Sequence, residues 1–205
     1  ANILEGDEPT YDTVFAAIKN GSPNARKHTQ TAPLTLTRTI EFFPDEGMYH
    51  YDGHRLCRVS FTPKETKKNK GICQVCQKPL TIGVLNRVES LADREEGLTP
   101  PEAIPFVSLV GLDKIIAEAL GVKSRQSPAV QREYEKLIKD GVNEFNVLLN
   151  LELEDLKKIT LARVAEGIRR VREKELKIEP GFDGQYGRVT IFSPEEKAEK
   201  QKRLF

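Results

Sequence analysis

Two short pairs of metal-ligand residues constrain this sequence more than any other feature. His54-x-x-Cys57 and Cys73-x-x-Cys76 each place two candidate ligands on either side of a two-residue spacer. Structural zinc takes four tetrahedral ligands from thiolates and imidazoles, usually as two such pairs joined by a longer loop. The sequence therefore predicts one structural zinc ion bound by His54, Cys57, Cys73 and Cys76, with residues 58–72 forming a charged surface loop.

Two alternatives to this ligand set stay open at the level of sequence. Cys73 and Cys76 could form a thioredoxin-like redox pair, but that motif opens a helix after a hydrophobic strand, and residues 70–72 do not have this character. His50 lies four residues before His54 and could take the fourth position if the chain loops back. We favour His54, because its spacing matches that of the other pair.

Cysteine content and hydropathy indicate the compartment. An odd number of cysteines, three in 205 residues, suits metal binding in a reducing environment better than a disulfide framework. The sequence has no apolar run long enough to span a membrane and no signal-peptide pattern, so we expect a cytoplasmic protein without a membrane partner.

A net charge of +1 excludes a strongly basic domain, so any nucleic-acid contact must be local.

Periodicity predicts a mixed α+β fold. Residues 11–20 have helical spacing, residues 37–43 have strand composition, and residues 44–83 are rich in turn residues around the candidate ligands. After the proline-rich stretch 97–105, helical stripes follow at 112–120, 128–141 and 151–177, and a short strand is expected at 188–192. Gly121 is the predicted C-terminal cap of the first of these helices, and Ser127 is the predicted N-terminal cap of the second. We therefore expect a small zinc-stapled domain with short strands, 44–96, followed by a mainly helical C-terminal domain, 97–205.

No pattern in the sequence predicts a catalytic site. The four zinc ligands leave no open coordination position for water, and the common hydrolase and nucleotide-binding motifs are missing from the sequence. We list no catalytic residue and expect the chain alone to be inactive.

Several long strings resemble the endonuclease Q family of PHP-domain phosphoesterases. They are residues 39–57, 73–85, 87–94, 115–121 and 180–187. Three positions depart from the family pattern: Gln74 and Gln77 stand where proline and glycine are usual, and Asn86 stands where we expect histidine. A non-glycine residue at a left-handed position such as 77 costs about 1 kcal/mol.

The resemblance implies a function for the longer protein. Residues 1–43 look like the trailing segment of an upstream PHP domain, which in this family holds the catalytic metals and cuts DNA. The remaining residues look like the zinc-binding and helical domains, which help to grip DNA around a deaminated or abasic site. The implied function is therefore the zinc- and DNA-binding part of a DNA repair endonuclease.

Clustered basic residues and tyrosines are the candidate DNA contacts. One cluster lies in the loop between the ligand pairs, a second lies on a predicted helix, and a tyrosine in the glycine-rich turn could stack on a base. These residues are Lys64, Lys67, Lys68, Lys70, Arg169, Arg170, Arg172 and Tyr186, with Tyr49 and Tyr51 as further aromatic candidates. The alternative is a zinc-stapled protein-interaction module whose basic residues face solvent and which has no nucleic-acid role.

Overall fold

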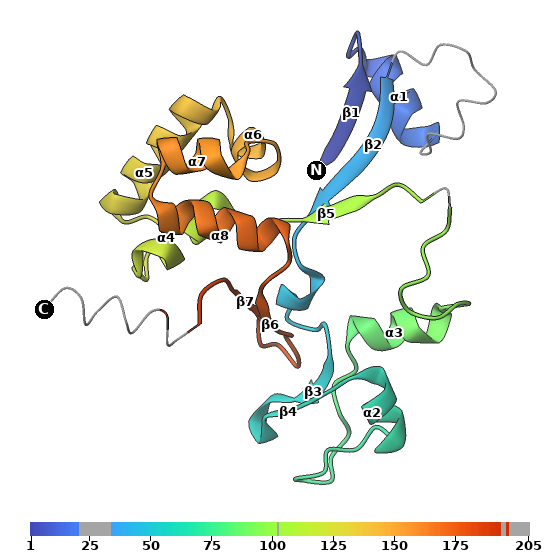
Figure 1. The fold of residues 1–205 in the computed structure, drawn as a ribbon. Coiled ribbons are helices and arrows are strands. Elements are labelled where there is room, and N and C mark those ends of the chain that lie inside the picture. Colours follow the sequence, from blue (N-terminus) through green and yellow to red (C-terminus); the bar gives the residue numbers. More distant parts are fainter. Residues whose placement is uncertain (21–33, 102, 194–195, 197–205) are drawn as a thin grey trace, which may run out of the picture. The chain divides into compact units, whose positions relative to one another are not determined.

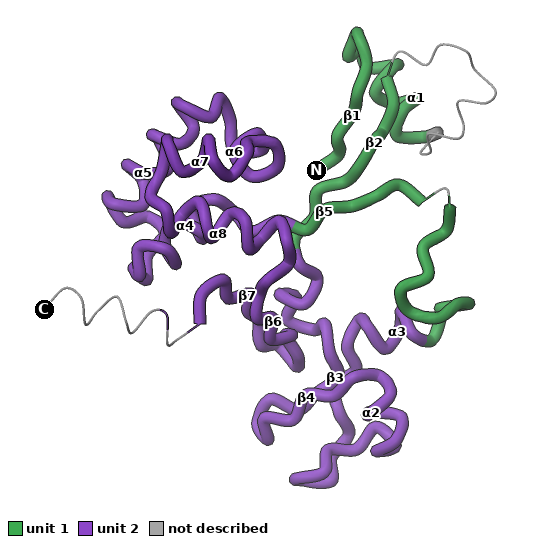
Figure 2. Tube along the Cα trace, viewed as in Figure 1, with its two compact units in different colours: residues 1–42, 90–108 green, residues 43–89, 109–205 purple. Residues whose placement is uncertain are grey.

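The computed structural model describes residues 1–20, 34–101, 103–193 and 196 and has a mixed α+β fold, as predicted (Figure 1). Contacts divide the chain into two compact units, residues 1–42 with 90–108 and residues 43–89 with 109–205 (Figure 2). This grouping differs from the three expected segments, which were defined by composition rather than by contacts. The candidate metal ligands and the C-terminal helices lie in the same unit.

The first unit is a small sheet with one helix. Strand β1 (Asn2–Gly6) pairs antiparallel with β2 (Leu34–Glu41), and β2 pairs parallel with β5 (Phe106–Ser108). Helix α1 (Tyr11–Asn20) packs on β2. The strand predicted at 37–43 begins three residues earlier, at Leu34, because Leu34 and Leu36 are also buried.

The first part of the second unit consists of very short elements. The 3-10 helix η2 (Pro44–Glu46) leads to a hairpin of β3 (Asp52–His54) and β4 (Val59–Phe61), with the 3-10 helix η3 (Arg55–Cys57) between the strands. Helix α2 (Pro63–Lys68) begins with a capping box between Thr62 and Glu65, and α3 (Val84–Leu91) follows the second ligand pair. Two-stranded hairpins are marginal by themselves in water, so these elements need further support.

The second part of this unit is helical. Its helices are α4 (Leu112–Leu120), α5 (Pro128–Gly141), α6 (Glu144–Leu149), α7 (Leu153–Ile159) and α8 (Ala162–Arg172). The cap predictions are confirmed: Gly121 ends α4 in the left-handed conformation with φ 74°, and the Ser127 hydroxyl accepts a hydrogen bond from the amide of Val130. Among the described residues, no helix is long and apolar enough to cross a membrane.

The helices enclose one apolar core. The stripe predicted on residues 112–120 is buried, and it meets α8 at Gly167, where an added Cβ would lie 2.8 Å from a methyl carbon of Ile115. Glycine is therefore required for the close approach of α4 and α8. The fully buried side chains include Leu112, Ile115, Ile116, Val130, Leu137, Leu156, Val164, Ile168 and Phe192.

A hairpin near the C-terminus contacts the short elements that precede the helices. Strands β6 (Lys177–Glu179) and β7 (Arg188–Thr190) pair antiparallel, and the turn between them lies against residues 44–51. The carbonyl of Gly181 accepts a hydrogen bond from the amide of Tyr51, and the amide of Gly181 donates to the carbonyl of Asp45. A side chain at Gly181 would collide with the carbonyl of Gly47, so the close backbone approach requires glycine there.

Arg172 supports the end of α6. Its guanidinium donates to the carbonyls of Val147, Leu148 and Leu151 at 2.9, 2.8 and 2.7 Å. The last carbonyls of a helix have no partner within the helix, and a cation near them also interacts favourably with the helix dipole. Burial lowers the pKa of Arg172 from its ordinary value, while Glu152 opposes this shift.

We predict that Arg172→Ala lowers the free energy of unfolding by about 2 kcal/mol, because it leaves partly buried carbonyls without donors. Arg132→Ala is the matched control, since Arg132 is exposed and should contribute less than about 0.5 kcal/mol. Urea unfolding followed by circular dichroism measures both. Equal stability of the two variants would contradict the role assigned to Arg172.

Candidate metal centre and its basic surroundings

The four predicted ligand residues come together in the structure. His54 ends β3, Cys57 ends η3, and Cys73 and Cys76 lie on the turn that precedes residue 80. Their ligand atoms all lie within 4.8 Å of one another, and Nδ1 of His54 is 3.3 Å from Sγ of Cys76. A set of three thiols and one imidazole at this spacing fits a tetrahedral structural zinc site.

Each ligand pair is followed directly by a residue in the left-handed conformation. Arg58, directly after Cys57, has φ 53°, and Gln77, directly after Cys76, has φ 59°. The amide of Arg58 donates to the carbonyl of Arg55, and the amide of Gln77 donates to the carbonyl of Cys73. Each pair is therefore a tight turn closed by a left-handed residue, and the left-handed position expected at residue 77 is confirmed.

His50 lies outside the cluster. Its ring stacks on Tyr51 with centroids 5.3 Å apart, and its Nε2 is 3.5 Å from Oδ1 of Asp45. Among the described residues, the group that could hold a metal ion contains His54 instead. The geometry thus favours the ligand set that spacing predicted, while zinc occupancy stays a prediction.

The thiols differ in acidity. Cys73 is fully buried, and although burial raises its pKa, hydrogen bonds from the backbone amides of Cys76 and Val75 and from His54 lower it to about 6. Burial and hydrogen bonds that the Cys57 thiol donates to the other two cysteines raise the pKa of Cys57 to about 11. Amides that stabilise a thiolate also suit a metal-bound sulfur, because a ligating cysteine is deprotonated.

Two buried or half-buried aspartates, which the sequence did not single out, position the cluster. Asp52 is fully buried and accepts hydrogen bonds from the amide of Gly83 at 2.6 Å and from Nδ2 of Asn86 at 2.7 Å. It therefore joins β3, which carries His54, to the start of α3. Asn86, at a position where the resemblance leads us to expect histidine, has a definite partner here.

Asp183 joins the cluster to the C-terminal hairpin. Its carboxylate accepts from the amide of Arg55 and from the hydroxyl of Thr81, both at 2.6 Å. The hydrogen bond from Thr81, followed by the one from Arg55, holds its pKa below the ordinary value. Thr81 also pairs with Gly53 through two backbone hydrogen bonds, so one carboxylate contacts both the residue that follows β3 and the residue that pairs with β3.

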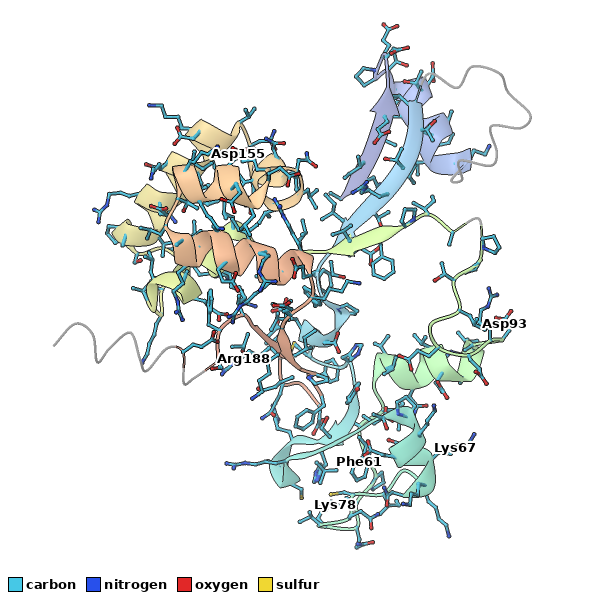
Figure 3. All side chains as sticks on the ribbon, viewed as in Figure 1. Phe61, Lys67, Lys78, Asp93, Asp155 and Arg188 are labelled. Atoms are coloured by element: carbon cyan, nitrogen blue, oxygen red, sulfur yellow. The ribbon has the colours of Figure 1, made fainter. Side chains whose placement is uncertain are left out.

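The four predicted lysines lie on one exposed segment. Lys64, Lys67 and Lys68 belong to α2, and Lys70 follows with φ 56°. All four are exposed, and within the part of the chain that the structure describes they form no ion pair. Figure 3 shows Lys67 on α2 and Lys78 on the second ligand loop at the same end of the unit.

The three predicted arginines instead make contacts within the protein. Arg169 pairs with Glu166, Glu173 and Glu175, and Arg170 pairs with Glu166 and Glu196. Arg172 binds the carbonyls at the end of α6. These contacts favour a structural role for the arginines, so we do not carry them into the proposed DNA interface.

The candidate tyrosines have different environments. Tyr186 is 76% exposed and Tyr49 is 48% exposed, whereas Tyr51 is half-buried against His50. The hydroxyl of Tyr49 lies near Gly184, in the turn that carries Tyr186. Tyr186 and Tyr49 are therefore accessible for stacking, and Tyr51 is mainly a packing residue.

We predict one zinc ion per chain in protein purified without chelator. Cys73→Ser should lose the metal and unfold residues 52–81, because structural zinc contributes on the order of 10 kcal/mol to folding in small zinc peptides. His50→Ala should keep a full equivalent of zinc. Elemental analysis measures all three proteins, and loss of zinc from His50→Ala would mean that the wrong histidine was chosen.

We predict that the ion pairs of Glu166 weaken at acid pH. Hydrogen bonds from Arg169 and, to a smaller extent, from Arg170 lower the pKa of Glu166 from 4.5 to about 2, although burial acts in the opposite direction. A lowered pKa in the folded state contributes stability that is fully present above 4.5 and is lost as pH falls toward 2. Glu166→Gln should therefore lower Tm at neutral pH. The difference in Tm between the variant and the parent should shrink as the pH falls from 4.5 toward 2.

The exposed Glu135 provides the control for this measurement. Glu135→Gln should leave Tm within about 1 °C of the parent throughout the same pH series, as expected for a surface substitution without partners. A Glu166→Gln difference that is independent of pH would contradict the assigned ion pairs.

Comparison with known proteins confirms the resemblance to the endonuclease Q family. Residues 111–175 match the family described as the MJ0043 C-terminal domain. Over 194 residues the chain is 34% identical to the uncharacterized protein MJ0043 of Methanocaldococcus jannaschii, a match that covers 95% of this chain and 22% of that protein.

Two solved structures are similar over almost the full length of the chain. The lesion-specific endonuclease PfuEndoQ from Pyrococcus furiosus superposes with a TM-score of 0.76 at 28% identity and covers 97% of this chain. Endonuclease Q in complex with a 27-mer duplex substrate with an abasic lesion at the active site gives 0.72, also at 28%, and covers 96%. The chain spans 46% of each of these proteins, so it is related to a DNA repair endonuclease and corresponds in length to slightly less than half of one.

Proposed function

We propose that this chain is the zinc-binding and DNA-binding part of a PHP-family endonuclease that acts on deaminated or abasic DNA. The observation that carries the proposal is the exposed lysine segment, residues 64–70, which lies between two ligand pairs that converge on one cluster. A similar protein whose structure contains a duplex with an abasic lesion supports DNA as the partner.

The charges near the cluster fit this role. Residues 53–80 contain seven basic residues and one acidic residue: Arg55, Arg58, Lys64, Lys67, Lys68, Lys70 and Lys78 against Glu65. Glu65 is engaged in the capping box with Thr62. A protein with a net charge of +1 thus has a strongly basic region confined to one end of a unit, which suits phosphate contacts.

In this proposal the chain binds DNA and does not catalyse its cleavage. The cluster offers four protein ligands and therefore fits a structural ion without a position for water. The catalytic metals and the cleavage step belong to the PHP domain of the same cytoplasmic enzyme. Tyr186 and Tyr49 are accessible aromatic side chains that can stack on an unpaired base.

The alternative function is a zinc-stapled protein-interaction module. It is favoured by apolar side chains around the start of α3, where Ile82, Val84 and Val88 are 55%, 62% and 54% exposed. Salt dependence separates the two functions, because phosphate contacts weaken steeply with salt and an apolar protein interface does not.

We predict that the chain binds duplex DNA weakly and in a salt-dependent manner, and that simultaneous replacement of Lys67, Lys68 and Lys70 by alanine weakens binding equally for all sequences. Each phosphate contact contributes about 0.9 to the slope of log affinity against log salt, so the slope should fall by about 2 to 3. Fluorescence anisotropy with labelled duplexes between about 50 and 200 mM salt measures this.

The matched control replaces Lys123, Lys136 and Lys139, which are exposed on the helical part and should leave the slope unchanged. The same slope for parent and for the first variant would remove residues 67–70 from the interface. Absence of any salt-sensitive binding by the parent would favour the protein-interaction module.

A further inference from the structure

Two apolar side chains occupy equivalent positions in the two ligand pairs. Leu56 directly precedes Cys57 and is 85% exposed, and Val75 directly precedes Cys76 and is 68% exposed. Each lies in a tight turn between two members of the cluster. The residue directly after the second member has the left-handed conformation. A single exposed leucine is ordinary on a protein surface, but here two exposed apolar side chains lie on the two halves of one site.

The cluster fixes the positions of these side chains. Both are adjacent to cysteines whose sulfur atoms lie within 4.8 Å of the other ligand atoms. The first turn is held further by the hydrogen bond from the amide of Arg55 to Asp183, and the second by the hydrogen bond from the amide of Cys73 to the carbonyl of Lys78. Such side chains can insert into a partner with little loss of conformational freedom.

The surrounding charges identify the class of partner. Leu56 lies between two exposed arginines, Arg55 and Arg58, and Val75 lies three residues before the exposed Lys78. An apolar tip bordered by cations does not suit an apolar protein groove, because the cations would lose water without gaining partners. It does suit a nucleic-acid duplex, in which phosphates border the grooves and base pairs present apolar faces.

We propose that Leu56 and Val75 form an apolar wedge that enters the minor groove of bound DNA and inserts between base pairs where stacking is already broken. The inference rests on the proposed DNA-binding function and assigns to these residues the preference for damaged over intact duplex. Unstacking a base step costs a few kcal/mol and costs least at a damaged or unpaired base. A wedge therefore adds affinity at a lesion, whereas the lysines add affinity to any duplex.

The test compares the zinc-loaded parent with the double variant Leu56→Ala/Val75→Ala. The ligands are two duplexes of the same sequence, one intact and one with a single abasic site flanked by 2-aminopurine. The parent should bind the abasic duplex more tightly than the intact one. In the variant the ratio of these two affinities should fall about tenfold, which corresponds to about 1.4 kcal/mol. Its affinity for the intact duplex and its salt slope should stay unchanged, and the rise in 2-aminopurine fluorescence on binding should disappear.

Two controls separate the wedge from other effects. Val88→Ala/Leu98→Ala removes the same residue types at exposed positions elsewhere and should keep the preference. The variant with alanine at positions 67, 68 and 70 should lose affinity for both duplexes, and the ratio of its affinities for the abasic and the intact duplex should stay the same. Zinc content of each variant, measured by elemental analysis, confirms that the cluster is intact.

Each outcome decides between the two proposals. An unchanged preference in Leu56→Ala/Val75→Ala, or a parent that binds both duplexes equally, overturns the wedge and leaves the DNA-binding function in place. A parent that shows no salt-sensitive binding to either duplex overturns the DNA-binding function and the wedge together.

Discussion

The convergence of His54, Cys57, Cys73 and Cys76 is the constraint on which the first part of the larger unit depends. Strands β3 and β4 have three residues each and α2 has six, so none of them is stable alone. Among residues 52–81 the buried hydrophobic residues are Cys73 and Leu80, which provide too little apolar surface for a core. Cross-links through a metal would replace the missing core, and this explains why the turns can leave Leu56 and Val75 exposed.

The cluster is tied to the rest of the unit by carboxylates. Asp52 holds β3 against the start of α3, and Asp183 reaches Arg55 and Thr81 from the hairpin that follows α8. Hydrogen bonds from backbone amides and hydroxyl groups to a carboxylate are among the stronger ones in proteins, and they are directional. The region around the cluster is therefore oriented by the helical part of the same unit.

Charge in this protein serves two different purposes. Arg169 and Arg170 of α8 are neutralised by Glu166, Glu173, Glu175 and Glu196, and Arg172 binds carbonyls at the end of α6, so these arginines stabilise the helical part. The lysines of α2 form no ion pair among the described residues and face solvent. Planar guanidinium groups suit fixed bidentate contacts, whereas flexible ammonium groups suit phosphates of variable position.

The sequence alone determined the α+β class, the four candidate metal ligands, the helix caps at Gly121 and Ser127, and the resemblance to the endonuclease Q family. These features depend on local spacing and local propensity, which are visible in a short window of residues. Only the tertiary structure revealed the roles of Asp52 and Asp183, the pairing of residues 106–108 with β2, and the internal partners of the arginines. Each of these depends on contacts between residues far apart in the chain; Asp183 and Arg55, for example, are separated by 128 positions. A basic cluster looks the same in a sequence whether its carboxylate partners lie beside it or point elsewhere, so the separation of structural arginines from exposed lysines required the fold.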